Sequence, residues 1–443
     1  MQEDEKYIRL TETPVNRLIT SLAVPTIISM LVTSIYNATD TFFVGRISTS
    51  ATAAVGLCFS VMAILQATGF FCGQGSGNYI SRELGAGNRK KAEEMSATGF
   101  ALAFVLGITI SALILLFINP LTQFLGATED ILTDSKAYLS VIALGAPLVL
   151  TQCVMNIQLR FQGSAIYAMT GLLSGAVINM ALDPLLIFGM GLGVKGAAMA
   201  TVSGQLISTV VLYIGTCRGG NIRPSFKNIR FNRLYLLQIV NGGSPSLIRQ
   251  GLMSLSTILL NRAAGLYGAA AIAGMSINNR VMMLVSSAII GFGQGYQPVC
   301  SFNYGAGKKD RVREGFFFCV KYGTIFLTVM AIICELFAPQ IIRIFRDDDA
   351  VVAIGSVALR AQAAALPLQA FVVLTNMMLQ ATGKGVKASI TASARSGIFF
   401  IPMIIVLPKL FGLIGIQISQ SISDVLAFFF SIPMAYSELK KMK

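Results

Sequence analysis

Long apolar runs separated by short polar segments dominate the sequence. Twelve runs hold about 20 or more mostly apolar residues, the length a helix needs to cross a hydrocarbon layer roughly 30 Å thick. In chain order they are 18–43, 52–79, 96–118, 135–158, 165–189, 196–216, 236–262, 271–300, 316–338, 352–378, 386–408 and 412–436. The pattern predicts an all-α polytopic membrane protein with twelve transmembrane helices, because a helix satisfies its backbone polar groups without water.

Basic residues alternate in density along the polar segments. Most of the 34 Lys and Arg fall in the two terminal segments and in every second segment between the runs. By the positive-inside rule both termini are therefore cytoplasmic, and an even number of spans agrees. The first run is too long for the apolar region of a signal peptide, so we expect an uncleaved first span.

The chain repeats itself at an offset of 220 residues. Gly73-Gln74-Gly75 corresponds to Gly293-Gln294-Gly295, and residues 85–87 to 305–307. Six runs per copy give both copies the same orientation, which predicts two parallel six-helix bundles with pseudo-twofold symmetry along the membrane normal. The expected parts are an N-terminal bundle, a cytoplasmic linker and a C-terminal bundle, at residues 1–217, 218–235 and 236–443.

Composition excludes several classes of function. The 443 residues are 54% hydrophobic and only 12% charged, against about 25% charged in soluble domains. The absence of His excludes His-ligated zinc and a Ser-His-Asp triad. The net charge of +14 lies between apolar runs, so it indicates orientation in a bilayer and no nucleic-acid partner. No G-x-x-x-x-G-K-[ST] motif occurs, so ATP is not an expected partner.

A carboxylate inside the fifth run is the first candidate for function. Asp183 lies in apolar surroundings, where an ionised side chain is costly and marks a functional site by default. Asn179 is one helical turn earlier on the same face, and Pro184 leaves the carbonyl of Met180 without its usual backbone donor. Carboxylate, amide and carbonyl oxygens are the ligands that a proton or a small hard cation needs.

Two further polar residues share the depth of Asp183. Asp40, Asp183 and Thr201 each lie six residues from the outer end of their run, which is about 9 Å along a helix. Both acids are near C-terminal helix ends, where the helix dipole disfavours a carboxylate, so helix capping is a poor explanation. Structural hydrogen bonding is the remaining alternative to ion coupling. The repeat places Leu260 and Pro402 at the positions of the two acids, so the predicted site is one-sided.

Other polar residues receive weaker predictions. Arg395 and Asp424 are expected to form a structural ion pair in the second bundle. Side chains that combine an apolar body with a neutral polar tip or a flexible sulfur are candidates for a substrate cavity, although each alone more often packs in a core. They are Asn37, Gln66, Gln152, Met155, Asn156, Asn278 and Met282.

The motifs together resemble the multidrug and toxic compound extrusion (MATE) transporters. They are Asp40 in the first run, Asn179-x-x-x-Asp183-Pro184 in the fifth and Gly193-Val-Lys-Gly-Ala-Ala-x-Ala-Thr201 after it. Gly293-Gln-Gly-Tyr-Gln-Pro298, Asn303-Tyr-Gly-Ala-Gly307 and Gln380-Ala-x-Gly383 are also similar to that family. The resemblance covers nearly the whole chain and is greatest to the DinF-like branch of bacteria and archaea.

The resemblance implies a secondary antiporter in the prokaryotic plasma (inner) membrane. Such a protein exports cationic, amphipathic organic compounds in exchange for H⁺ or Na⁺, without a further cofactor, and we take a monomer as the default. The implied ion-coupling residues are Asp40, Asn179, Asp183 and Thr201, with Tyr36 close by. The first four are also the candidate ligands for Na⁺. Another branch carries acids in the seventh and tenth runs, and this chain has none there.

Two other functions remain as alternatives. A lipid-linked glycan flippase of the same superfamily would need cations for a pyrophosphate, and Arg249, Arg280 and Arg395 are the candidates within the membrane. A membrane-embedded enzyme would have to use an aspartyl pair, since the chain has no H-E-x-x-H and no C-x-x-C motif. We expect that the protein is not an enzyme.

Overall fold

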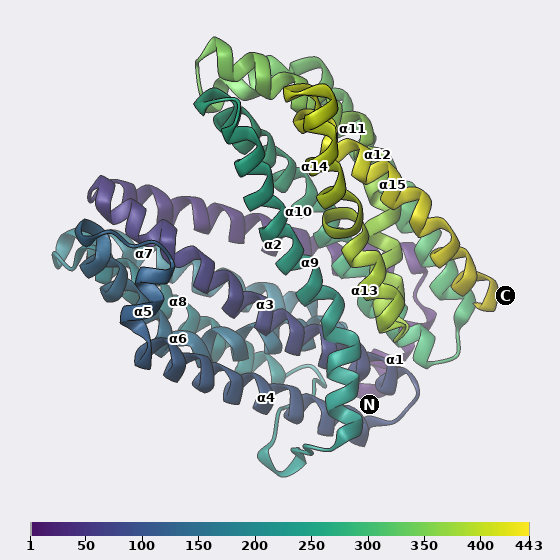
Figure 1. Ribbon diagram of the computed structural model, residues 1–443. Coiled ribbons are helices and arrows are strands. Elements are labelled where there is room, and N and C mark those ends of the chain that lie inside the picture. Colours follow the sequence, from purple (N-terminus) through teal and green to yellow (C-terminus); the bar gives the residue numbers. More distant parts are fainter. Residues whose placement is uncertain (1, 443) are drawn as a thin grey trace. The chain divides into compact units, whose positions relative to one another are not determined.

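The computed structural model describes residues 2–442, apart from the side chains of residues 2, 3, 37 and 38. Within this range every regular element is a helix (Figure 1). The helices are α1 (Gln2–Glu12), α2 (Val15–Gly45), α3 (Thr49–Gly85), α4 (Arg89–Leu116), α5 (Ile118–Phe124), α6 (Glu129–Phe161), α7 (Ala165–Pro184), α8 (Gly193–Thr216), α9 (Arg233–Gly265), α10 (Ala269–Gly305), α11 (Lys309–Phe345), α12 (Asp349–Ala381), α13 (Gly385–Ser393), α14 (Phe400–Phe411) and α15 (Leu413–Leu439). The predicted all-α fold class is confirmed.

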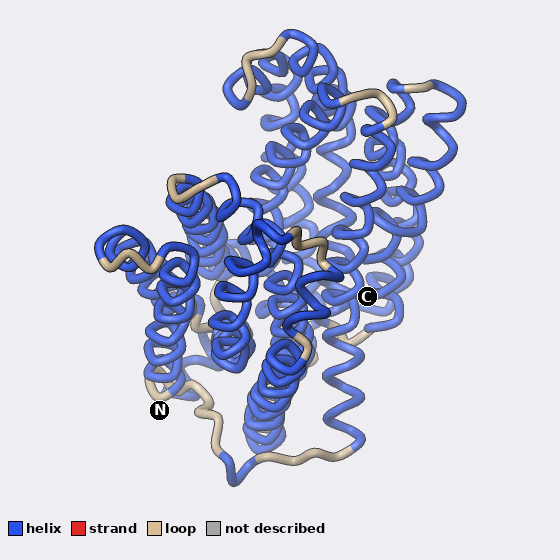
Figure 2. The backbone as a smooth tube through the Cα atoms, turned by 60° about the vertical axis from the view of Figure 1, so that its left-hand side comes forward, coloured by secondary structure: helices blue, strands red, loops and turns tan. Residues whose placement is uncertain are grey.

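Four short helical segments complete the description. Two are π-helices, η1 (Leu185–Gly189) and η3 (Ala394–Phe399), and two are 3₁₀ helices, η2 (Phe226–Asn228) and η4 (Lys440–Met442). Most of the long helices are joined by short loops, and the longest connection runs from α8 to α9 through η2 (Figure 2). This connection contains most of the predicted linker.

Eleven helical segments of the described chain are long and apolar enough to cross a membrane. Helix α7 continues through η1 as one span, and α13, η3 and α14 together form another. The remaining predicted span, 236–262, lies in α9, which is long enough but is not among the eleven. Its sequence contains Arg249 and several Gly, Ser and Asn residues, which lower its hydropathy. The spans thus follow the predicted order, with one that is more polar than the rest.

The chain packs into two compact units that differ from the two halves of the sequence. Unit 1 comprises the chain up to Thr13 together with Val24–Gly243, and unit 2 comprises Pro14–Ala23 together with the chain from Ser244 onward. Helices α2 and α9 therefore each pass from one unit to the other within the helix, next to Pro25 and Pro245. The two passages are 220 residues apart, which is the offset of the sequence repeat. The halves at 1–217 and 236–443 remain our proposal for the duplicated segments.

The repeated Gly-Gln-Gly segments allow two helices to approach closely. In unit 1, a Cβ atom added to Gly75 would lie 2.3 Å from the carbonyl oxygen of Ile239 in α9. In unit 2, a Cβ atom added to Gly295 would lie 2.4 Å from the Cα of Ala23 in α2. Small residues at such crossings are typical of helix association in membranes. The segment that each unit takes from the other half of the sequence therefore packs on a glycine of the same motif.

One buried hydrogen bond is repeated with the same offset. In unit 1, the Asn156 side-chain amide on α6 donates to the carbonyl of Ala168 on α7 at 2.8 Å. In unit 2, the Asn376 amide on α12 donates to the carbonyl of Ala388 on α13 at 2.6 Å. Both asparagines are 220 residues apart, and so are both acceptors. The internal repeat thus extends from the sequence to individual contacts.

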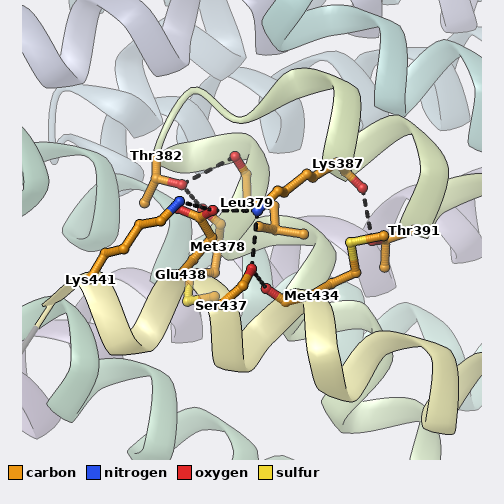
Figure 3. Close-up of polar contacts among 9 residues, drawn as sticks. All are labelled: Met378, Leu379, Thr382, Lys387, Thr391, Met434, Ser437, Glu438 and Lys441. Atoms are coloured by element: carbon orange, nitrogen blue, oxygen red, sulfur yellow. Dashed lines mark hydrogen bonds and ion pairs between the residues drawn. The ribbon is translucent and has the colours of Figure 1, made fainter.

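A buried carboxylate fixes the C-terminal end of α15 in unit 2. Glu438 is 2% exposed and accepts hydrogen bonds from Lys387 Nζ on α13 at 2.6 Å and from Lys441 Nζ at 3.1 Å (Figure 3). Lys387 also donates to Ser437 Oγ at 3.0 Å. The ion pair joins two helices that are about 50 residues apart in sequence. It closes the end of the unit at which the chain ends.

The Glu438 cluster predicts a measurable loss of stability. Glu438→Gln leaves two lysines without their carboxylate, a change that costs about 3–5 kcal/mol in a fully buried pair. Since both lysines are partly exposed, we expect about 1–2 kcal/mol and a fall of several degrees in the unfolding temperature. A thiol-reactive fluorophore can follow unfolding in detergent, because five cysteines are buried. Glu12→Gln, at an exposed position of α1, is the control, and an equal fall in both variants would contradict the assignment.

Candidate functional site

Polar side chains from three helices meet inside unit 1. Helix α2 carries Tyr36 and Asp40, α7 carries Asn179 and Asp183, and α8 carries Thr201. The Asn179 amide donates to Thr201 Oγ1 over a long 3.4 Å. The Tyr36 hydroxyl is within hydrogen-bonding reach of the Thr201 side chain and within electrostatic range of both acids. The residues proposed for ion coupling therefore lie in one place, and their role remains a proposal.

The acidic cluster is buried and lacks hydrogen-bond donors. Asp183 is 0% exposed and Asp40 is 5% exposed. Both carboxylate oxygens of Asp183, Oδ1 of Asp40 and Oδ1 of Asn179 are buried without a hydrogen-bond partner. A buried polar atom without a partner costs about 1–3 kcal/mol, and more when it is charged. These oxygens therefore need a proton or a cation to complete their surroundings.

Close packing of α7 on α8 positions the amide and hydroxyl of the cluster. A Cβ atom on Gly175 would lie 2.7 Å from the carbonyl oxygen of Gly204, and a Cβ on Gly204 would lie 2.6 Å from that of Gly175. Only glycine at both positions allows this separation. Gly204 also faces Asn179, whose Cβ would be 3.0 Å away from an added methyl group. The glycine pair thus sets the distance between Asn179 and Thr201.

The helix that carries Asp183 changes its winding directly after the acid. Helix α7 ends at Pro184, which has no N–H, and Leu185–Gly189 continue as the π-helix η1. The first hydrogen bond after this segment joins the N–H of Met190 to the carbonyl of Leu185 at 2.9 Å. The sequence indicated a disturbed helix at Pro184, and the disturbance takes this form. Such π-turns within helices are frequent at functional sites.

A tyrosine that the sequence analysis did not select belongs to the same region. Tyr138 on α6 is 0% exposed and lies within electrostatic range of Asp40, Asp183 and Tyr36. Its hydroxyl contacts Met62 Sδ at 3.4 Å. Depth counting was applied to acids and to Thr201 alone, and a buried tyrosine is usually a packing residue. Its position near the outer end of the 135–158 run was the available signal.

The asparagines proposed for a substrate cavity have internal partners. Asn156 binds the backbone of α7, as described above, and is 5% exposed. Asn278 is 3% exposed and donates to Gln362 Oε1 at 2.9 Å within unit 2. The side chain of Asn37 lies outside the described residues. The two described amides therefore hold helices together in this conformation, and a substrate role for them remains a prediction.

The other cavity candidates differ in exposure. Met155 and Met282 are 1% and 3% exposed and pack in the cores of unit 1 and unit 2. Gln152 is half-buried and donates to Ser208 Oγ at 2.9 Å. Gln66 is exposed on α3. Among these four, Gln66 and Gln152 have side chains that a dissolved compound could reach without repacking.

Unit 2 contains an acid whose surroundings are complete. Asp424 is 2% exposed, and its Oδ1 accepts from Arg395 Nε at 2.7 Å and from Gln420 Nε2 at 3.0 Å. Its Oδ2 accepts from Gln369 Nε2 at 2.8 Å. Arg395 lies in the π-helix η3. The two residues proposed as a structural pair are thus in contact, and this carboxylate needs no further ion.

A proton or a monovalent hard cation is the ligand that the unit 1 cluster can hold. Its free atoms are carboxylate and amide oxygens, next to the hydroxyls of Tyr36 and Thr201. No group of three His, Cys, Asp or Glu side chains that could bind a metal occurs in the part of the chain searched. Apolar spans around a one-sided acidic cluster define a polytopic membrane transporter.

Comparison with known proteins agrees with this class. The family model MatE matches residues 25–185 and 245–406, which is most of both halves. The chain belongs to this family, the MATE transporters. It is 29% identical over 440 residues to the multidrug export protein MepA of Staphylococcus haemolyticus, covering 98% of this chain and 96% of that protein. MepA of Staphylococcus aureus is also 29% identical, over 439 residues with the same coverage.

Solved structures of similar fold come from the same family. One is an outward-facing multidrug resistance MATE transporter of the MOP superfamily, with 26% identity, a TM-score of 0.91 and coverage of 99% of this chain and 98% of that one. Another is a MOP superfamily transporter from Pyrococcus furiosus, with 25% identity, a TM-score of 0.92 and 98% coverage of both chains. The predicted membership of the MATE family and the fold class are therefore confirmed.

Packing at Gly204 yields a test of the site geometry. In Gly204→Ala the new methyl group meets the Gly175 carbonyl and Asn179, and overpacking of this kind costs about 1–3 kcal/mol. We expect lower thermal stability and weaker ion-driven transport in reconstituted vesicles, because Asn179 moves relative to Thr201. Gly56→Ala on α3, where a Cβ meets no atom within 4 Å, is the control and should retain both properties. Equal transport in the two variants would show that the close contact has no role in the site.

Proposed function

We propose that the protein is a secondary antiporter that exports cationic, amphipathic drugs and other toxic organic compounds in exchange for H⁺ or Na⁺. It acts in the prokaryotic plasma membrane as a multi-pass protein with both termini in the cytoplasm. Neither ATP nor an organic cofactor takes part. The observation that carries the proposal is the set of buried oxygens of Asp40, Asn179 and Asp183 that have no hydrogen-bond partner.

Ion binding supplies the partner that these oxygens lack. Without an ion, two ionised carboxylates make the interior of unit 1 strongly negative, since charges interact over long distances at low dielectric constant. This state attracts a cationic compound. A proton or Na⁺ at Asp40 and Asp183 reduces the negative charge and weakens that attraction. Because the coupling between two ligands is reciprocal, each binding event disfavours the other, which is the requirement for exchange.

The known proteins support the choice of substrate and the existence of two states. The staphylococcal relatives are named multidrug export proteins, and we extend that substrate class to this chain. A MATE protein that is 25% identical has been solved in a straight and in a bent conformation. Helix α2 contains both Pro25 and Asp40, so we propose that ion binding changes the shape of this helix.

A lipid-linked glycan flippase is the weaker alternative. A pyrophosphate needs several cations, and three arginines were the candidates. Arg280 is exposed and Arg395 is already paired with Asp424. Arg249 contacts Asn376 Oδ1 at a long 3.5 Å and has no ion pair among the described residues. A single unpaired guanidinium in unit 2 is a poor match for a pyrophosphate, so we retain the antiporter.

Loss of either carboxylate is expected to abolish coupling. Asp40→Asn and Asp183→Asn keep the shape of the side chain but remove the charge that a proton or Na⁺ neutralises. Efflux of a fluorescent cationic dye from vesicles should fall to the background rate in each variant. The double variant should be no worse than the single ones, because the two residues act as a unit.

The matched control is Glu335→Gln, which changes an exposed acid on α11. We expect normal efflux from this variant at equal protein content in the membrane. Undiminished efflux from both aspartate variants would contradict the proposed coupling site. Loss of efflux in all three variants would indicate a general effect of charge and would also contradict it.

Separate gradients identify the coupling ion. Vesicles containing the wild-type protein are given a pH gradient without sodium, and then a sodium gradient at equal pH on both sides. We expect one of the two to drive dye efflux, and the effective one to lose its effect in Asp183→Asn. Dye movement that depends on neither gradient would exclude antiport, and binding of a lipid-linked pyrophosphate would then favour the flippase.

A further inference from the structure

A groove of about 620 Å³ lies on unit 2 and contains none of the residues of the acidic cluster. One wall is the start of α2, which contributes Asn16, Arg17, Thr20 and Ser21. The other walls are aromatic, with Phe292 from α10 and Phe318 and Tyr322 from α11. The opposite face of α2 is buried, since Val15, Leu18, Ile19 and Leu22 are at most 2% exposed. The groove therefore combines one polar helix face with three aromatic rings.

Exposure of α11 places the groove on the membrane-facing surface of unit 2. The most apolar window of α11 is only 22% buried, the lowest share among the eleven spans. Its exposed side chains include Tyr322 at 50% and Ile325 at 50%. In a membrane such a surface contacts lipid. The groove is thus open to lipid molecules along the wall formed by α11.

The polar end of the groove can bind an anion. The Arg17 side chain is exposed and has no ion pair among the residues that the structure describes. Asn16 Oδ1 accepts from the backbone N–H of Arg17 at 2.8 Å, which leaves the amide N–H groups of Asn16 as donors. Lys321 Nζ lies 5.8 Å from the ring of Tyr322 and adds a second positive charge at the rim. No carboxylate lines the groove.

Polar and apolar parts of the groove are arranged along the membrane normal. Arg17 is about 3 Å from the start of α2, whereas Phe292 is about 20 Å from the end of α10 and Tyr322 about 20 Å from the start of α11, at 1.5 Å per residue. Val15 and Ile19 contact the position of Gly315 near the start of α11, so the two helices begin at the same end. The cationic residues thus lie near a membrane surface and the rings lie deeper.

We infer that this groove binds an anionic phospholipid, with its phosphate on Arg17 and Asn16 and an acyl chain against Phe292, Phe318 and Tyr322. Basic pockets between transmembrane helices are typical sites for such headgroups. The repeat supplies a contrast within the same chain. Position 237, the copy of Arg17, is Leu, and position 102, the copy of Tyr322, is also Leu. The binding site is therefore specific to unit 2.

The absence of tryptophan from the chain permits a direct test. Tyr322→Trp places a single fluorophore in the groove of the full-length protein, and the variant is reconstituted into vesicles that contain a brominated lipid. Quenching by brominated phosphatidylglycerol is compared with quenching by brominated phosphatidylcholine. We expect about a fivefold preference for phosphatidylglycerol, because one basic residue near the surface contributes about 1 kcal/mol. Adding Arg17→Gln should reduce the preference to about one, and Arg17→Lys should retain it.

Two controls separate this site from general attraction and from a soluble anion. Phe104→Trp on α4 of unit 1, where the native ring is 45% exposed, should show no preference between the two lipids. An equal preference at both reporters, or a preference in the Tyr322→Trp protein that survives Arg17→Gln, would overturn the proposal. Glycerol phosphate in solution should leave the preference unchanged. If it removes the preference, the groove binds soluble phosphates and the lipid assignment is wrong.

Discussion

A carboxylate can remain inside a bundle of membrane helices only if something offsets its charge, and unit 1 buries two. The helices around them do not supply enough donors, since three carboxylate oxygens have no partner. Asn179 reaches Thr201 only because Gly175 and Gly204 bring α7 and α8 together. The π-helix after Pro184 belongs to the same local arrangement. The site is therefore held open by well-packed neighbours and depends on an exchangeable ion for its missing contact.

Unit 2 shows how the same architecture handles an acid that needs no ion. Asp424 has three donors, one of them the guanidinium of Arg395, so its charge is offset within the protein. Neutralisation is permanent there and conditional in unit 1. A duplicated fold has thus acquired different electrostatics in its two copies, and the buried hydrogen bonds of Asn156 and Asn376 show that the scaffold itself was retained. Ion binding can change the charge of one unit while the other remains constant.

The sequence predicted the helices and the depth of the acidic cluster, because both depend on local properties. Apolar length gives the spans, and a constant rise per residue places Asp40, Asp183 and Thr201 at one level. Rotation about the helix axis cannot be counted in this way, so Tyr138 was missed, and Asn156 and Asn278 turned out to bind neighbouring helices. The π-helices and the passage of α2 and α9 between units result from packing of distant segments, which leaves no period in the sequence.

The passage of α2 from unit 2 to unit 1 has a consequence for biogenesis. Residues 14–23 are synthesised among the first, yet their packing partners in unit 2 begin at Ser244. Unit 1 in turn is complete only when the first part of α9 has emerged. A chain of half this length could build such units only by exchanging segments with a second copy, as a domain-swapped dimer does. Fusion of the two halves makes that exchange intramolecular, so assembly of each unit no longer depends on the concentration of the protein in the membrane.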